Sequence, residues 1–86
     1  MVKDRKSVLV VDDEAKIVEV IASFLQSRGF VVFPAGNGET ALQIFDRENI
    51  TLVVLDLMMP GLSGEEVCRI LRKRSRVPII MLTAKA

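Results

Sequence analysis

The sequence lacks the features that would place an 86-residue chain in a membrane, in an oxidising compartment or on a nucleic acid. Its single cysteine, Cys68, cannot form an internal disulfide, and its charged amino end lacks the apolar stretch of a signal peptide. No apolar run approaches the ~20 residues that span a bilayer, because Asp12 and Asp56 interrupt the best candidates. Twelve basic and eleven acidic residues leave a net charge of +1, too small to attract nucleic acid or an anionic membrane by itself. We therefore expect a soluble, cytoplasmic chain with no direct nucleic-acid contact by this segment.

Aromatic residues are also scarce, because all four are phenylalanine, whereas half of the chain is hydrophobic. The core must therefore consist of aliphatic side chains packed between layers of secondary structure. The length allows one domain at most, and a chain this short buries a smaller share of its surface than a typical domain does.

The hydrophobic residues form short continuous runs separated by segments of helical periodicity. Buried-strand patterns occupy residues 7–11, 30–33, 52–55 and 77–83. Helical patterns begin at Glu14, after Asn37 and after Ser63, where the Ser-x-x-Glu spacing is typical of a capping box. Strands that alternate with helices at this rhythm predict an α/β fold with a parallel sheet, whose strands all end at the same edge.

The pattern also predicts which face of the first helix is buried and where the second strand ends. The first helix is expected to bury an apolar face that consists of Ile17, Ile21, Phe24 and Leu25. Pro34, with the glycines that follow it, is expected to mark the turn after the second strand.

Acidic and hydroxyl side chains stand at the predicted strand ends, in the order Asp12 and Asp13, then Asp56, then Thr83. Ligands of open α/β sheets bind beyond the carboxyl ends of the strands. Crowded carboxylates require a proton or a cation among them, and an all-oxygen ligand set suits Mg2+, which commonly binds phosphate oxygens as well. The pattern therefore indicates phosphoryl transfer, with Asp56, alone at its strand end, as the best nucleophile.

Each of these residues also has a plainer interpretation. An acid pair between a strand and a helix is usually an N-cap, Asp56 alone could be a turn residue, and Thr83 alone could be a β-branched strand residue. A phosphohydrolase with an acid-x-acid arrangement is disfavoured because Met58 occupies the position of the second acid. A nucleotide-binding enzyme is disfavoured because no glycine-rich phosphate loop follows a strand. A non-catalytic structural or assembly fragment remains the alternative.

Three segments, Val10–Glu14, Val54–Gly61 and Pro78–Ala84, resemble the receiver domain of bacterial two-component response regulators. The resemblance runs through almost the whole chain. It implies a flavodoxin-like parallel sheet with strand order 2-1-3-4-5 and helices on both faces.

The resemblance also implies a mechanism and a set of site residues. A sensor histidine kinase would transfer a phosphoryl group from its phosphohistidine to Asp56, so the chain would be a phosphoacceptor and not a turnover enzyme. Mg2+ would be held by Asp13, Asp56 and the main-chain carbonyl of Met58, with Asp12 orienting metal-bound water. Thr83 would be the switch hydroxyl.

The family has five βα units, and residues 1–86 contain three followed by a strand, so we expect a truncated receiver domain without the last two helices and the fifth strand. The family's lysine from the fifth strand is absent, and Lys85 is not a substitute for it. The resemblance suggests a transcriptional response regulator as the parent protein. An exposed fourth strand or an uncovered sheet face would favour self-association. Without the family's lysine and fifth strand, phosphorylation would be impaired.

Overall fold

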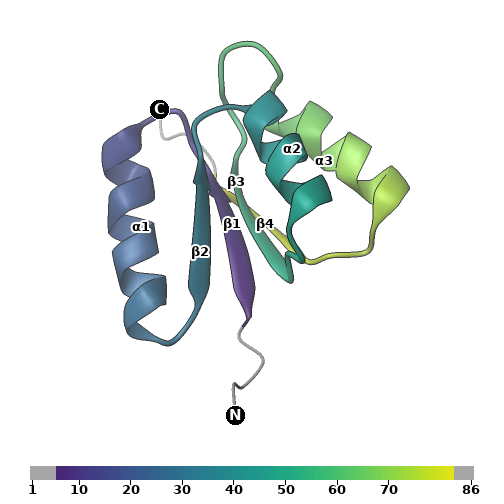
Figure 1. The fold of residues 1–86 in the computed structure, drawn as a ribbon. Helices are drawn as coiled ribbons and strands as arrows, with labels where there is room; N and C mark the ends of the chain where they lie inside the picture. Colours follow the sequence, from purple (N-terminus) through teal and green to yellow (C-terminus); the bar gives the residue numbers. More distant parts are fainter. Residues whose placement is uncertain (1–5, 83–86) are drawn as a thin grey trace.

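The computed structural model of the chain describes residues 6–82, and in this range strands and helices alternate strictly (Figure 1). The elements are β1 (Ser7–Val11), α1 (Ala15–Ser27), β2 (Val31–Ala35), α2 (Gly38–Arg47), β3 (Leu52–Asp56), α3 (Gly64–Arg74) and β4 (Ile79–Leu82). The order of elements is the one that the sequence predicts.

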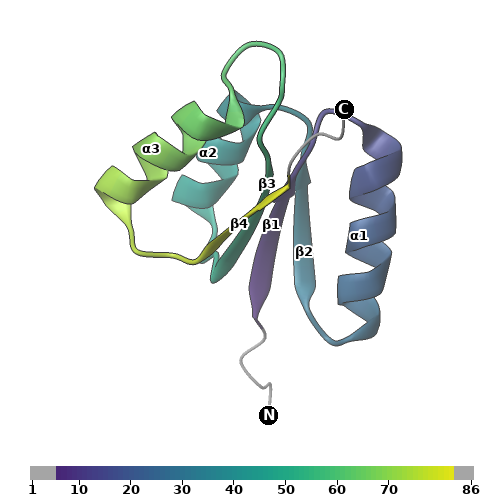
Figure 2. The ribbon, with the colours of Figure 1, turned by 180° about the vertical axis from the view of Figure 1, so that it is seen from behind.

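The four strands form one parallel sheet with the order β2-β1-β3-β4. Helix α1 covers one face of the sheet, and α2 and α3 lie side by side on the other (Figures 1 and 2). The predicted flavodoxin-like fold is therefore confirmed, with helices on both faces and the first four strands in the predicted order. No helix in the described part is long and apolar enough to cross a membrane.

The core has two parts because successive strand residues point to opposite faces of the sheet. The larger cluster lies beneath α2 and α3 and contains the fully buried side chains Leu9, Leu55, Val67 and Leu71. The smaller cluster lies beneath α1 and is built from Val8, Val10, Val18 and Val54. Both contain only aliphatic residues at their centre, as the scarcity of aromatic residues predicts.

The predicted buried face of α1 is wrong at two positions, because Ile17 is 38% exposed and Phe24 is 57% exposed. Only a narrow stripe of α1 faces the sheet, made of Val18, Ile21 and Leu25. Phe24 lies one position to the side of that stripe, and the Arg28 guanidinium lies 4.7 Å from the centroid of its ring. The cation–π contact shields part of a ring that the sheet does not cover.

The prediction that Pro34 marks a turn is also wrong, because Pro34 lies inside β2, which extends to Ala35. The Val31 N–H donates to the Lys6 carbonyl. The Ala35 carbonyl accepts from the Asp12 N–H, so alternate residues of β2 direct their backbone groups toward β1. Pro34 falls between them and faces the outer edge of the sheet, where its missing N–H costs no ladder hydrogen bond.

The two predicted helix caps are confirmed. The Asn37 side chain accepts from the Thr40 N–H at 2.8 Å, and Ser63 forms a complete capping box with Glu66. Strand β4 begins at Ile79, two residues later than predicted. Thr83 lies outside the described residues.

Candidate metal centre

The acids converge because of the strand register. Val11 of β1 pairs with Leu55 of β3. The residues that follow them in sequence, Asp12 and Asp56, therefore lie side by side at the carboxyl edge of the sheet. Asp13 follows directly, and one carboxylate oxygen from each of the three acids lies within 4.8 Å of the others. The structure thus brings together three of the four predicted strand-end residues, while the fourth, Thr83, is outside the described range.

Asp12 is held in place by two hydrogen bonds. Its N–H donates to the Ala35 carbonyl at 3.1 Å, which continues the ladder between β1 and β2. Its Oδ1 accepts from the Glu14 N–H at 2.9 Å and closes the turn between β1 and α1. The N-cap position of α1 belongs to Glu14, which makes no side-chain cap hydrogen bond. The interpretation of the acid pair as an N-cap is therefore wrong, and both carboxylates are available to the edge of the sheet.

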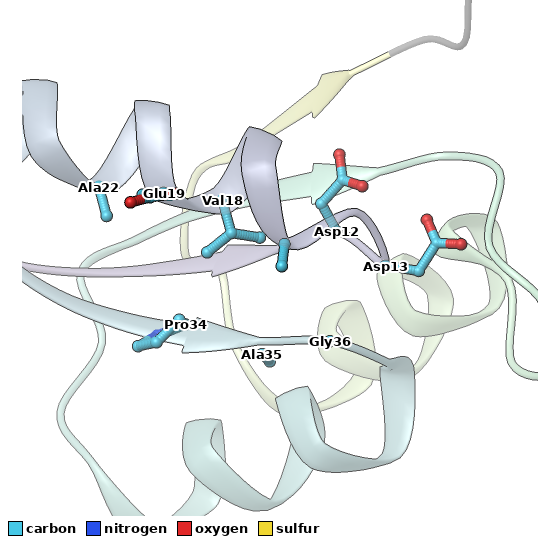
Figure 3. Close-up of a pocket in the computed structure, with 9 residues that line it drawn as sticks. Asp12, Asp13, Val18, Glu19, Ala22, Pro34, Ala35 and Gly36 are labelled. Carbon is cyan, nitrogen blue, oxygen red and sulfur yellow. The ribbon is translucent and has the colours of Figure 1, made fainter.

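Asp13 is exposed, and Figure 3 shows its carboxylate and that of Asp12 beyond the end of β1. A cleft of about 350 Å³ runs from these acids between α1 and β2, with Val18 and Pro34 among its apolar walls (Figure 3). Asp56 does not line this cleft. The cleft therefore reaches two of the three carboxylates and does not enclose the whole cluster.

Asp56 is the last residue of β3 and is only 8% exposed. Its Oδ1 accepts from the Met58 N–H at 3.2 Å, so one oxygen of the carboxylate is oriented by the loop that follows. Both backbone polar groups of Leu57 are hydrogen-bonded: its N–H donates to the Leu82 carbonyl at 2.9 Å, and its carbonyl accepts from the Gly64 N–H at 3.1 Å. The loop after the central acid is thus fixed close to it.

The pKa of Asp56 is raised above its usual value of 3.8, chiefly because burial disfavours the charged form. The Met58 N–H opposes this shift, while the negative charges of Asp12, Asp13 and Glu14 add to it. A cation bound among the carboxylates would offset the repulsion between them and would favour the charged form of Asp56.

The donor set fits Mg2+. The cluster offers only carboxylate oxygens, which a hard divalent cation prefers, and the exposed Asp13 leaves space for bound water. The Met58 side chain is 64% exposed, and a thioether is a poor ligand for this ion, so only its main-chain carbonyl is a candidate.

A family model described as the response regulator receiver domain matches residues 8–86. The chain belongs to the response regulator receiver family. Receiver domains are signalling phosphoacceptor modules and not turnover enzymes, as the sequence predicts. A probable transcriptional regulator, ycf27 of Porphyridium aerugineum, is 55% identical over 80 residues, covering 93% of this chain and 33% of that protein. The receiver segment thus spans about a third of the length of the curated relatives that it matches.

Solved structures show the same similarity. The response regulator TrrA of Thermotoga maritima, in complex with Mg(2+)-BeF, is 46% identical, with a TM-score of 0.87 over 94% of this chain and 71% of that chain. TrrA in complex with the histidine kinase ThkA matches with the same identity and TM-score.

Sequence reasoning missed two members of this receiver's site. Glu14 adds to the negative field at Asp56, and the start of α3 at Gly64 fixes the Leu57 peptide. A glycine directly after a capping serine was the available signal for the second, because glycine is a poor helix former.

Proposed function

We propose that Asp56 accepts a phosphoryl group from the phosphohistidine of a sensor histidine kinase. Mg2+ is held by Asp13, Asp56 and the main-chain carbonyl of Met58, and Asp12 contacts the ion through water. The observation that carries the proposal is the convergence of three carboxylates within 4.8 Å at the carboxyl edge of the sheet. Such a cluster is unfavourable without a cation and is well suited to one that also binds phosphate oxygens.

The residues divide the reaction between them. Met58 N–H holds Asp56 Oδ1, and we assign the nucleophilic role to the second oxygen of that carboxylate. This oxygen forms a bond to phosphorus as the phosphorus–nitrogen bond of the donor breaks, and the imidazole leaves with the bonding electrons and takes up a proton. When bound, Mg2+ neutralises charge on the phosphoryl oxygens. The product is an acyl phosphate on Asp56.

The comparisons support the wider assignment. TrrA, 46% identical, has been solved in complex with the histidine kinase ThkA, which favours a histidine kinase as the phosphoryl donor. The relative ycf27 is named a probable transcriptional regulator, which favours a transcriptional response regulator as the parent. We place residues 1–86 at the amino-terminal part of its receiver domain. Thr83, next in sequence to Leu82, which pairs with Asp56, is proposed as the switch hydroxyl.

Intact-mass spectrometry after incubation with Mg2+ and acetyl phosphate tests the assignment. Wild type should gain one phosphoryl adduct, which EDTA prevents, and Asp56→Asn should gain none. Asp46→Asn removes an exposed acid far from the cluster and should behave as wild type. An adduct on Asp56→Asn, or none on wild type at saturating Mg2+, would contradict the proposal.

A second role, assembly with another copy, is favoured by the difference between the two sheet edges. The carbonyls of Pro78 and Leu82 accept hydrogen bonds from β3, so Ile79 and Met81 direct their backbone groups outward. No described strand pairs with that edge. Strand β4 contains no proline or charged residue, and its Ile80 side chain is 51% exposed. Natural edge strands usually carry one of those protections.

The distribution of charge favours a second copy as the occupant of this edge. Arg76 lies just before the amino end of β4, and the acidic cluster lies at the carboxyl edge. Antiparallel pairing of two β4 strands would bring the basic end of each copy toward the acidic end of the other.

The substitution Met81→Pro removes one outward N–H from β4, as Pro34 does on the opposite edge. Sedimentation velocity should show association of wild type at high concentration and a monomer for Met81→Pro. Gln43→Ala, on the exposed surface of α2, is the control and should associate as wild type does. A monomeric wild type at all concentrations would exclude this role.

A further inference from the structure

The start of α3 presses against the backbone that carries the central acid. Gly64 is the first residue of α3 and is buried. A Cβ at this position would overlap the Asp56 carbonyl oxygen and would lie 2.7 Å from Leu57 Cα and 2.9 Å from the Asp56 carbonyl carbon. All of these neighbours are backbone atoms, so no side-chain rotation can relieve the overlap.

Space, and not backbone conformation, is the reason for glycine at this position. Of the two glycines in this loop region, Gly61 has a φ of +75°, which other residues rarely adopt, whereas Gly64 has no such angle. An alanine at 64 could adopt the helical backbone. It would have to displace either α3 or the Asp56–Leu57 peptide by roughly 1 Å, since carbon atoms pack at about 3.5–4.0 Å.

We propose that Gly64 is a positioning residue for the Mg2+ site, an inference that rests on the proposed function. Its N–H holds the Leu57 carbonyl, and its missing side chain lets α3 lie directly against the Asp56–Leu57 peptide. Together these contacts set the separation between the Asp56 carboxylate and the Met58 main chain, which are the two ligands assigned to the β3–α3 loop.

The separation between these two ligands is important because Mg2+ tolerates little distortion of its ligand geometry. Mg2+ requires nearly ideal octahedral geometry with ligands at about 2.0–2.1 Å, whereas Ca2+ accepts irregular geometry at about 2.3–2.6 Å. A shift of roughly 1 Å in one ligand is therefore costly for Mg2+ and much less costly for Ca2+. A change in the preference between the two ions separates a positioning role from a general loss of stability.

The test compares Gly64→Ala with two other glycine variants. At Gly36 no atom lies within 4 Å of a Cβ, and at Gly38 the nearest atom is Val67 Cγ2, a side-chain and not a backbone atom, at 2.8 Å. Isothermal titration should show Mg2+ affinity reduced roughly 10- to 100-fold in Gly64→Ala, with a smaller reduction for Ca2+. Gly36→Ala should bind as wild type does, and Gly38→Ala should lose stability without a change in ion preference. Equal loss of both ions in Gly64→Ala, or Mg2+ binding equal to wild type, would overturn the inference.

Amide exchange measured by NMR keeps the inference testable if the variant does not fold or if Mg2+ does not bind. In wild type, Mg2+ should slow exchange of the Met58 and Gly64 amides and leave the distant Gly29 amide unchanged; no slowing would overturn the inference. A wild type that binds no Mg2+ contradicts the proposed function. In that case the positioning role is tested in the absence of metal. It is overturned if the Leu57 and Met58 amides exchange at the same rates in wild type and in Gly64→Ala.

Discussion

The two loops that carry the acids are built differently. The loop between β1 and α1 is short, leaves Asp13 exposed and leads into a helix without a side-chain cap. The loop between β3 and α3 is longer, ends in a capping box and is fastened to its own strand through Leu57 and Gly64. The first loop supplies charge at the sheet edge, and the second holds Asp56, the proposed acceptor, in place. The comparison predicts that substitutions in the first change ion binding, whereas those in the second divide between geometry and stability.

The largest effect is expected for Asp13→Asn, which removes an exposed carboxylate from the first loop. Mg2+ affinity should fall at least about tenfold, because a proposed direct ligand is lost. Thermal stability should change little, because Asp13 is exposed. Glu19→Gln on α1 removes the same charge outside the cluster and is the control in a calorimetric titration. An equal loss of affinity in both variants would mean that general negative charge, and not ligation, attracts the ion.

The next effect concerns Asp56 in the second loop. Its pKa is raised above 3.8 in the folded state, so the folded chain binds this proton more tightly than the unfolded chain does. Stability from this group is therefore complete below pH 3.8 and is lost as pH rises through the folded pKa. In EDTA, Asp56→Asn should raise the free energy of unfolding at pH 7, because it removes a buried negative charge.

That advantage of Asp56→Asn should disappear below pH 3.8, as judged by urea unfolding across the pH range. Asp46→Asn, an exposed acid, should show no comparable gain at neutral pH. Parallel stability profiles for wild type and Asp56→Asn would mean that the carboxylate cluster carries no electrostatic cost.

The smallest effect separates helix capping from site geometry within the second loop. Ser63→Ala removes the capping box and should lower the free energy of unfolding by about 1 kcal/mol. Asn37→Ala, the equivalent cap of α2, should cost a similar amount. Neither variant should change Mg2+ affinity much, because the close contact at Gly64 remains. Weak Mg2+ binding by Ser63→Ala alone would assign the positioning role to the cap.

The sequence predicts the fold well because its patterns are local. The runs of Val and Leu that end at Asp12 and Asp56 define buried strands, and their alternation with helices leaves few topologies. Ile17, Phe24 and Pro34 were mispredicted for reasons that are not local. The burial of Ile17 and Phe24 depends on how wide a stripe of α1 meets the sheet, and the tolerance of Pro34 depends on β2 being an edge strand.

The residues of the candidate site could be predicted from the sequence, but the contacts that hold them in place could not. Three acids at strand ends can be read from the sequence, and the parallel sheet brings them to the same edge. Leu57 is held because its N–H donates to β4 and its carbonyl accepts from the start of α3, and the spacing of residues in the sequence does not reveal such tertiary contacts. The roles assigned to Asp12, Asp13, Asp56, Met58 and Thr83 remain predictions.

Pro34 also bears on the stoichiometry of any assembly. With β2 blocked by its proline, the sheet formed by residues 6–82 can gain a strand on one side only, next to β4. Two copies joined there by a twofold axis would each use their single open edge and would leave none for a third. Association through β4 would therefore stop at a closed pair and would not continue into a filament.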